Sequence, residues 1–317
     1  MNTIVVTGGA GFIGSHLTEA YLRDGWRVVV VDDFSCGTKE NLAAVWDSPH
    51  LVVERVDIRD GAALTDVFRK YRPTAVNHHA AQKSVADSMA RPLLDQDING
   101  KGFLQVLTAA MDVGVKQIVY ASSGGALSKV IEGDELSHED DPPQLISPYA
   151  VHKFAGEKYL AMYAAQGAYQ YTVLRYANVY GPRQVADGEC GVVPIFVDNI
   201  LAGRPSTLMT YPDMPRGCSR DYVYVGDVVR ANLMATAHPL NTVVNIGSGR
   251  ETYILDIYEM LAALFDSEQP IHRVGPRPGD IRRSVLCADR AQRLLGWTPE
   301  VDWQEGLQRL QASIRRQ

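Results

Sequence analysis

A glycine-rich run constrains the fold of this chain more than any other segment. The β-branched stretch Thr3–Thr7 leads into glycines at 8, 9, 11 and 14, and the amphipathic stretch Phe12–Arg23 overlaps and follows them. A strand that turns into a helix through glycines can approach a pyrophosphate closely and point helix N-terminal amides at it, although such a turn also occurs without a ligand. The residues expected to hold the ligand are Gly8, Gly11, Phe12, Ile13 and Gly14.

An acidic residue stands where the next strand is expected to end. Asp32 follows the run Arg27–Val31, at the distance from the glycines where a carboxylate binds both hydroxyls of an adenosine ribose. A ribose phosphate would be repelled there, and no basic residue directly follows Asp32 to bind one. The sequence therefore favours NAD over NADP, and we include Asp33 among the residues expected at the ribose.

The pair Asp57-Ile58 follows a third strand-like run, Leu51–Val56. We expect it to hold the adenine between a polar edge and an apolar face. An aspartate at this place is also a common cap for a following helix. The cofactor contact is favoured because the glycine-rich turn and Asp32 supply its context.

Short β-branched runs alternate with amphipathic stretches, which predicts an α/β fold with a Rossmann-type, doubly wound parallel sheet. The expected strands are Thr3–Thr7, Arg27–Val31, Leu51–Val56, Thr74–His78, Gln117–Ala121, Tyr171–Tyr176 and, returning later, Thr242–Ile246. The expected helices are Phe12–Arg23, Ala62–Lys70, Leu93–Met111, Tyr149–Ala165, Val193–Leu201, Tyr253–Phe265 and Trp303–Arg315.

The character of the sequence changes after residue 183. Loops rich in proline and glycine, Val185–Gly191 and Tyr211–Gly217, flank a single helical stretch and predict a smaller mixed α/β lobe. We expect a Rossmann domain of residues 1–176 and 221–247 and a lobe of residues 177–220 and 248–317.

A tyrosine and a lysine one helical turn apart, Tyr149 and Lys153, suggest acid–base chemistry. The lysine ammonium can lie near the phenol oxygen, where it favours the phenolate and lowers a tyrosine pKa that starts near ~10. The tyrosine then becomes a usable base near neutral pH. The spacing alone occurs by chance in many helices, so the glycine-rich turn supplies the necessary context.

Composition and charge exclude several classes of partner. The 31 basic and 37 acidic residues give a formal charge of -6, without a long basic run for nucleic acid. No apolar stretch is long enough to span a bilayer, no signal-type segment opens the chain, and four scattered cysteines indicate no disulfide framework, so we expect a cytoplasmic protein. The adjacent His78 and His79 would point to opposite faces of a strand, and we assign no metal.

These motifs resemble those of the extended short-chain dehydrogenase/reductase family, and within it the UDP-glucose 4-epimerase branch. The resemblance runs nearly end to end. Its motifs are Thr7-Gly-Gly-Ala-Gly-Phe-Ile-Gly14, Ala80-Ala81-Gln82, Tyr120-Ala-Ser-Ser123, Ser147-Pro-Tyr149 with Lys153, Leu174-Arg-Tyr176-Ala-Asn178-Val-Tyr-Gly-Pro182, Arg220-Asp221-Tyr222 and Arg277-Pro-Gly-Asp280.

The resemblance implies roles for particular residues. The catalytic set would be Ser123, Tyr149 and Lys153. Further cofactor contacts would come from Ala80, Ala81, Gln82, Asn99, Ser122 and Tyr176, together with Tyr149 and Lys153. A nucleotide sugar, expected to be a UDP-sugar, would be bound by Lys83, Ser123, Gly124, Asn178, Val193, Arg220, Arg277 and Asp280, and we expect the smaller lobe to be the substrate-binding lobe.

The reaction that fits this set is epimerisation at C4 of the sugar. Oxidation of a 4-hydroxyl needs a positioned base and a hydride acceptor, which Tyr149 and NAD would provide, while Ser123 positions the sugar oxygen. The 4-keto sugar would then turn over and take the hydride back on its other face, with no net redox change.

Two alternative functions remain open. Related dehydratases carry an Asp-Glu pair directly after the catalytic Ser or Thr, and decarboxylases usually carry a glutamate there. This chain has Gly124-Gly125, which supply no side-chain acid or base and are expected to leave room for a bulky sugar. A nucleotide-sugar dehydratase or decarboxylase is therefore the alternative enzyme, and a non-catalytic dinucleotide-binding protein is disfavoured by the intact Tyr149 and Lys153.

Near the expected catalytic residues, the chain departs from the family pattern. Ala126-Leu127-Ser128-Lys129 replaces the usual Val-Tyr-Gly or Ile-Tyr-Gly, and Lys129 brings a positive charge near the expected pocket. His152 replaces a small residue, and we expect it to be an exposed helix residue rather than a proton shuttle. By resemblance, a homodimer would form through Leu93–Met111 and Tyr149–Ala165, although buried alanines and leucines there would also suit a monomer core.

Overall fold

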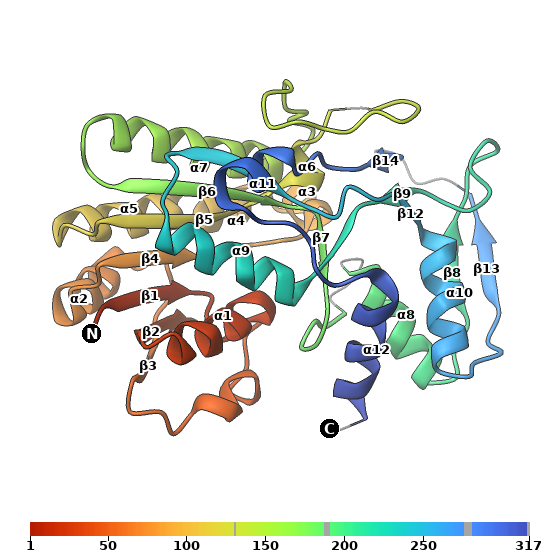
Figure 1. Ribbon diagram of the computed structural model, residues 1–317, viewed down its shortest axis with the longest axis horizontal. Coiled ribbons are helices and arrows are strands. Elements are labelled where there is room, and N and C mark those ends of the chain that lie inside the picture. The colour runs from red at the N-terminus through yellow and green to blue at the C-terminus, as the bar shows by residue number, and fades with distance from the viewer. Residues whose placement is uncertain (130, 187–190, 276–280, 316–317) are drawn as a thin grey trace.

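A seven-stranded parallel sheet forms the centre of the computed structural model, which describes residues 1–129, 131–186, 191–275 and 281–315 (Figure 1). The strand order is β11-β6-β5-β4-β1-β2-β3. Their bounds are β1 (Thr3–Thr7), β2 (Arg27–Asp32), β3 (Leu51–Arg55), β4 (Ala75–His78), β5 (Gln117–Ser123), β6 (Gln170–Tyr176) and β11 (Thr242–Ile246). The predicted doubly wound sheet is confirmed, and every predicted strand ends within two residues of its expected bounds.

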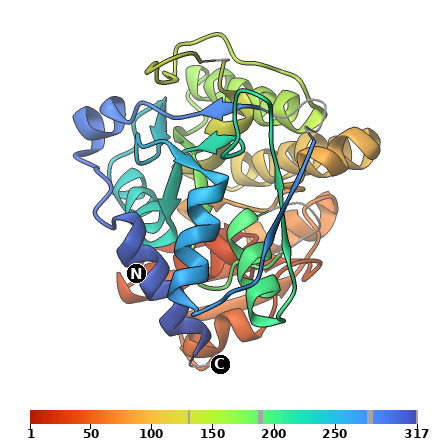
Figure 2. The ribbon, with the colours of Figure 1, turned by 90° about the vertical axis from the view of Figure 1, so that its right-hand side faces the viewer.

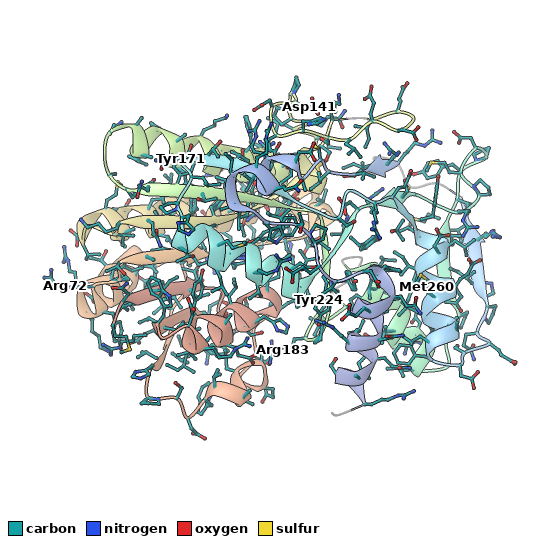
Figure 3. All side chains as sticks on the ribbon, in the orientation of Figure 1. Arg72, Asp141, Tyr171, Arg183, Tyr224 and Met260 are labelled. Carbon is teal, nitrogen blue, oxygen red and sulfur yellow. The ribbon has the colours of Figure 1, made fainter. Side chains whose placement is uncertain are left out.

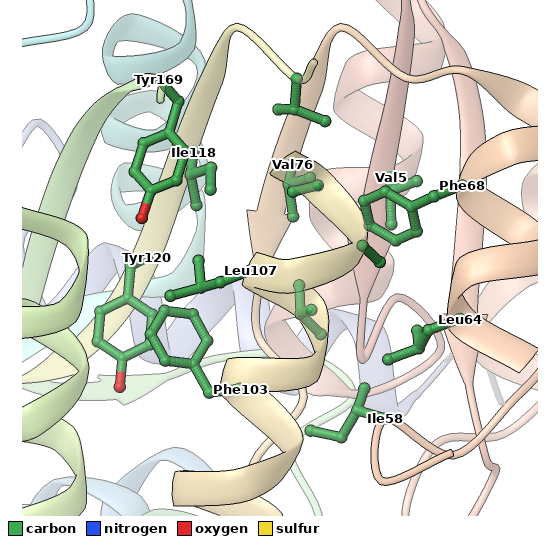
Figure 4. Packing of buried hydrophobic residues seen from close by; sticks show 14 of the residues in the cluster. Val5, Ile58, Leu64, Phe68, Val76, Phe103, Leu107, Ile118, Tyr120 and Tyr169 are labelled. Atoms are coloured by element: carbon green, nitrogen blue, oxygen red, sulfur yellow. The ribbon is translucent and has the colours of Figure 1, made fainter. Parts of the chain in front are cut away.

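Helices cover both faces of the sheet, which explains why its strands are continuously apolar rather than alternating. On one face, α1 (Phe12–Arg23) and α9 (Val225–Ala237) pack on the sheet. On the other face lie α2 (Gly61–Tyr71), α5 (Phe103–Asp112) and α7 (Pro148–Ala165). In this second layer the Phe103 and Tyr120 rings lie 4.5 Å apart between their centroids (Figure 4).

The predicted helices are confirmed to within one residue at each end, with one exception. The exception is Leu93–Met111, which is not a single α-helix but α4 (Pro92–Asp95), the π-helical segment η2 (Gln96–Gly102) and α5. Helices that the sequence did not indicate are the long helix α9 and the short helices η1 (Glu40–Val45), α3 (Val85–Ala90), α6 (Gly124–Leu127) and α11 (Asp289–Leu295).

The π-helical segment η2 has a local cause in its glycines. Gly100 and Gly102 are poor α-helix formers, and a Cβ on Gly102 would lie 2.9 Å from the side chain of Ile58. The backbone of η2 therefore approaches the buried Ile58 more closely than a larger residue would allow. Segments of this kind are frequent at functional sites.

The smaller lobe lies beside the carboxyl ends of the strands (Figures 1 and 2). Its core joins α8 (Val192–Leu201), α10 (Ile254–Leu264) and α12 (Trp303–Ile314). Its short strands are β8 (Ser206–Met209) paired with β13 (Ile271–Val274), and β12 (Thr252–Tyr253), β9 (Ser219–Arg220) and β14 (Arg283–Ser284) in one sheet. A further pair, β7 (Asn178–Tyr180) with β10 (Tyr222–Tyr224), leads from the large sheet toward the lobe.

One late segment packs against the large sheet rather than within the lobe. Trp297 is fully buried in a cluster with Leu174 and Val244, and its indole Nε1 donates a 2.9 Å hydrogen bond to the carbonyl of Asp227. The predicted loop Tyr211–Gly217 is present, whereas most of Val185–Gly191 lies outside the described residues. Within the described ranges, no helix has the length and apolar character needed to cross a membrane.

Candidate functional site

The glycine-rich turn brings the end of β1 close to the segment after β4. Gly8 has a positive φ of 67°, and a Cβ there would lie 2.7 Å from the backbone nitrogen of Ala80. A Cβ on Gly14 would lie 2.0 Å from the carbonyl oxygen of Gly8. Both positions therefore require glycine. Phe12 and Ile13 form the first turn of α1, directly after Gly11.

The residues at this turn fit a dinucleotide. No side chain among the described residues caps α1, and its first turn holds no acidic residue, so its amides are available to an anion. The Asp32 carboxylate is buried at the end of β2, where it accepts 2.9 Å hydrogen bonds from the backbone nitrogens of Ala10 and Phe34. Burial raises the pKa of Asp32, and these two hydrogen bonds oppose the rise.

Asp57 and Ile58 differ in their surroundings. Ile58 is buried in the core beneath η2, whereas Asp57 is partly exposed and forms an ion pair of 2.5 Å with Arg59. Asp57 does not cap α2, because Asp60 does so by accepting from the backbone nitrogen of Ala63. Nearby, Asp33 accepts from the backbone and hydroxyl of Ser35.

Asn99 connects η2 to the segment after β4. Its Oδ1 accepts a 3.0 Å hydrogen bond from the backbone nitrogen of Gln82, and its Nδ2 donates to the Gln82 carbonyl at 2.8 Å. This double contact holds Ala80, Ala81 and Gln82 beside the glycine-rich turn. Lys83 follows them and is exposed.

The expected catalytic set is brought together where β5 ends and α7 begins. Ser123 is the last residue of β5, and its Oγ accepts from the backbone nitrogen of Ala126 at 3.2 Å. Lys153 donates a 2.9 Å hydrogen bond to the carbonyl of Ala121, and its Nζ lies 5.8 Å from the ring centroid of Tyr149. Lys153 is only 4% exposed, and burial lowers its pKa to about 8.

A buried ion pair behind this set was not anticipated from the sequence. Glu157 accepts two hydrogen bonds from the Arg175 guanidinium, at 2.8 and 2.7 Å, and a third from the Ser122 hydroxyl at 2.7 Å. Glu157 lies one helical turn after Lys153 on α7. Its place on the same helix face is the sequence feature that could have indicated a role for Glu157 near the catalytic set. The pair fixes Ser122, and with it the end of β5.

His152 corrects an expectation. It is not an exposed helix residue, because its side chain is 12% exposed and its Nδ1 lies 2.5 Å from Oδ2 of the fully buried Asp95. Asp95 Oδ1 also accepts from Asn99 Nδ2 at 2.8 Å. No sequence pattern indicated this contact, because the two residues are far apart along the chain.

The two glycines after Ser123 have different surroundings. A Cβ on Gly124 would lie 2.3 Å from the side chain of Leu286, so the space beside Gly124 is already filled. No described atom lies within 4 Å of a Cβ built on Gly125. Open space beside this pair therefore lies at the second glycine, and whether a sugar fills it stays a prediction. Lys129, further along, lies 3.5 Å from Glu135 and 3.6 Å from Asp141.

The expected substrate residues are distributed between the sheet and the lobe. Asn178 on β7 donates through Nδ2 to the carbonyl of Asp221 at 3.0 Å, and Arg220 on β9 donates to the Ser219 carbonyl at 2.8 Å. Val193 is buried in the lobe core on α8. The expected residues Arg277 and Asp280 lie outside the described residues.

Asp221 belongs to the motif Arg220-Asp221-Tyr222, from which no role was predicted for it. Its buried carboxylate accepts from the backbone nitrogens of Ser248, Gly249 and Leu286 and from the Ser248 hydroxyl. Burial raises the pKa of Asp221 to about 6, against these hydrogen bonds. Asp221 thus fixes the strand that carries Arg220.

Tyr176 and the two adjacent histidines form buried hydrogen bonds. The Tyr176 hydroxyl lies 3.1 Å from His79 Nε2 and accepts from Asn232 Nδ2 at 2.8 Å. His78 Nδ1 lies 2.8 Å from the Thr7 hydroxyl instead, so the two histidines point to different partners. In the described part of the chain, no group of three His, Cys, Asp or Glu side chains could hold a metal ion.

The chain is similar to known proteins over most of its length. The model of the NAD dependent epimerase/dehydratase family matches residues 4–247. A UDP-glucose 4-epimerase of Mycolicibacterium smegmatis is 40% identical over 304 residues, which cover 96% of this chain and 95% of that protein.

Two solved structures resemble the fold throughout. The crystal structure of UDP-glucose 4-epimerase with UDP-glucose from Thermotoga maritima has a TM-score of 0.92 and 39% identity. The structure of the Thermus thermophilus UDP-glucose 4-epimerase in complex with NAD has a TM-score of 0.92 and 40% identity. Each comparison covers 99% of both chains.

Proposed function

Because the chain belongs to the NAD dependent epimerase/dehydratase family, we propose that it is an NAD-dependent 4-epimerase of a UDP-hexose or a UDP-N-acetylhexosamine. The observation that carries this proposal is the placement of Ser123, Tyr149 and a buried Lys153 at one edge of the sheet, beside a glycine turn that fits a dinucleotide. When bound, NAD supplies a hydride acceptor that later returns the hydride.

The side chains then have distinct tasks. The nearby ammonium of Lys153 favours the phenolate form of Tyr149. This phenolate takes the proton of the sugar 4-hydroxyl and becomes the neutral phenol. Ser123 hydrogen-bonds the same sugar oxygen from the end of β5. Tyr149 returns the proton after the 4-keto sugar has turned over, so the reaction needs no additional acid or base.

We assign the cofactor to the turn at Gly8, Gly11, Phe12, Ile13 and Gly14. The adenosine ribose would lie at Asp32 and Asp33, and the adenine at Asp57 and Ile58. The remaining contacts would come from Ala80, Ala81, Gln82, Asn99, Ser122, Tyr149, Lys153 and Tyr176. The hydroxyl of Tyr176 already binds Asn232 and His79, so its contact would use the ring or backbone.

The UDP-sugar would lie between the sheet edge and the lobe. We assign it to Lys83, Ser123, Gly124, Asn178, Val193, Arg220, Arg277 and Asp280. Support is strongest at Arg220, which Asp221 holds in position, and weakest at Val193, which is 2% exposed. The open space at Gly125 is where the sugar ring has room.

The division into a cofactor domain, residues 1–176 and 221–247, and a nucleotide-sugar lobe, residues 177–220 and 248–317, remains our proposal. The hydrophobic core that α8, α10 and α12 share supports this division. The segment around Trp297 is the exception, because it packs on the large sheet.

We further propose that the enzyme is a cytoplasmic homodimer. An apolar groove of about 530 Å³ between α3, α4 and the start of α7 supports the dimer. Met89, Leu93 and Ile146 line it and are 60%, 81% and 52% exposed. The free cysteines Cys36, Cys218 and Cys287 are consistent with a reducing compartment.

The test is to incubate the purified protein with NAD and, separately, UDP-glucose, UDP-N-acetylglucosamine and UDP-glucuronate. Proton NMR and mass spectrometry would follow each mixture. A galacto-configured product of unchanged mass is expected. Loss of water would instead indicate a dehydratase, and loss of carbon dioxide a decarboxylase. No change with any sugar would contradict the proposed function.

A further inference from the structure

A buried carboxylate that the proposed mechanism does not use is hydrogen-bonded to His152, the residue directly before the catalytic lysine. Asp95 is the last residue of α4 and is fully buried. Its Oδ2 accepts a 2.5 Å hydrogen bond from His152, and its Oδ1 accepts from Asn99 at 2.8 Å. An ionised carboxylate can only accept, so His152 Nδ1 must carry a proton here. Burying such a charge is costly unless it is paired, and both oxygens are paired.

This carboxylate joins two elements of the site. His152 lies on α7 between Tyr149 and Lys153 in sequence, whereas Asn99 belongs to η2. Asn99 is in turn hydrogen-bonded to both backbone groups of Gln82. A continuous series of hydrogen bonds therefore runs from the helix of the base to the segment assigned to the cofactor.

The charge of Asp95 also acts on Lys153. Burial lowers the Lys153 pKa, and the charge of Asp95, followed by that of Glu157, raises it. Glu157 is already engaged by the Arg175 guanidinium, so Asp95 is the carboxylate without a guanidinium partner. The other titratable groups facing Lys153 are Tyr149 on α7, Tyr120 on β5, and His78 and His79 at the end of β4.

We propose that Asp95 and His152 form a positioning pair for epimerisation. His152 holds the carboxylate of Asp95 in place, and Asp95 keeps the ammonium of Lys153 protonated while joining α7 to Asn99. This inference rests on the proposed function. Neither residue touches the sugar or the cofactor in this role, so both act through Lys153 and Asn99.

The first experiment measures Lys153 directly, without substrate or turnover. Lysines labelled with ¹³C at Cε are titrated by NMR, and the Lys153 signal is identified by its loss in Lys153→Arg. In Asp95→Asn the midpoint of Lys153 is expected to fall by at least ~0.5 pH unit, because the ammonium loses a nearby negative charge. An unchanged midpoint would overturn the proposal.

The matched control is Asp87→Asn on the neighbouring helix α3. Asp87 is half exposed and paired with Arg91, so neutralising it removes the same charge at the surface. The Lys153 midpoint is expected to stay at its wild-type value. If Asp95→Asn fails to fold, the same titration on His152→Ala decides, since that variant keeps Asp95 but removes the donor that holds it.

The second experiment compares His152→Ala with His152→Asn in the epimerase assay. An asparagine amide can donate from nearly the position of His Nδ1, whereas alanine cannot. His152→Ala is expected to lower kcat about tenfold with little change in KM, and to move the alkaline limb of the kcat profile to lower pH. His152→Asn is expected to restore most of kcat and the position of the limb.

A purely structural role predicts a different result. Both variants would then lower kcat equally at every pH, and the alkaline limb would not move. That outcome would refute the positioning role. If the wild-type protein shows no epimerase activity at all, the proposed function fails, while the Lys153 titration still decides whether Asp95 acts on the ammonium.

Discussion

At the scale of single residues, the protonation of Lys153 depends on its burial. Lys153 is 4% exposed and donates a hydrogen bond to the carbonyl of Ala121 on β5. With a pKa of about 8, the ammonium is close to losing its proton in the physiological range. The nearby carboxylates of Asp95 and Glu157 therefore determine how much of it remains charged.

Replacing Tyr149 with phenylalanine removes the proposed base without changing the ring. We expect kcat to fall by roughly 10²–10⁴-fold, which is the usual contribution of a positioned acid–base group. NAD content should be nearly unchanged, because the glycine turn and Asp32 are untouched. Turnover by NMR and cofactor content by absorbance check this, and wild-type turnover in the variant would disprove the assignment.

Replacing Lys153 with methionine should abolish turnover and yet stabilise the fold at neutral pH. The folded pKa of about 8 lies below the unfolded value of 10.5, so the folded state loses the proton first and the wild type gains stability as pH rises between these values. The advantage of the variant, on the order of 3 kcal/mol below pH 8, should therefore shrink toward pH 10.5.

Urea unfolding of both proteins from pH 7 to pH 10 measures that difference. The hydrogen bond from Lys153 to the Ala121 carbonyl is lost in the variant and will reduce the gain by about 1 kcal/mol. A difference that stays constant over this range would mean that Lys153 titrates normally.

At the scale of elements, local pattern predicted most of the architecture. The seven strands of the large sheet and the long helices other than α9 follow from apolar periodicity, and their bounds were close because tertiary packing reinforces the same pattern. The break in Leu93–Met111 was missed because the apolar residues on either side of η2 were read as one helical pattern, while η2 itself holds only one apolar side chain, Ile98. The contact between His152 and Asp95, and that between Glu157 and Arg175, depend on how separate elements pack, which a single sequence does not reveal.

The two glycines of α6 offer a test at this scale. Gly124→Ala should destabilise the protein by about 1–3 kcal/mol, because the new methyl group would displace Leu286, which is itself buried in the core. Gly125→Ala, one residue further in the same helix, meets no described atom within 4 Å and should change stability by less than ~1 kcal/mol. Equal effects on the unfolding free energy would show that Leu286 moves freely.

At the scale of the whole molecule, the segment that enters the lobe forms hydrogen bonds with helix α1. Arg183, which follows β7, donates to Glu19 and, at 3.2 Å, to the Ser15 hydroxyl of α1 (Figure 3). His16 on the same helix lies 3.0 Å from the carbonyl of Pro182. The helix that would hold the pyrophosphate is thus directly bonded to the segment that enters the lobe.

The proposed dimer can be tested in the apolar groove. Leu93→Asp places a charge on its most exposed apolar side chain and should convert a dimer into a monomer, as measured by light scattering. Leu201→Asp, on α8 and 56% exposed, is the matched control and should leave the mass unchanged. A wild-type protein that is already monomeric at micromolar concentration would contradict the dimer.

The position of Trp297 has a consequence for biosynthesis. The Trp297 indole completes the core beneath β6 and β11. In the sequence, however, Trp297 stands about fifty residues after β11, the last strand of that sheet. When the ribosome has released all the strands of the Rossmann sheet, it has therefore not yet released Trp297. This side chain completes one of the hydrophobic clusters on the sheet. The nascent cofactor domain should remain exposed to chaperones until the ribosome has also released the segment around Trp297.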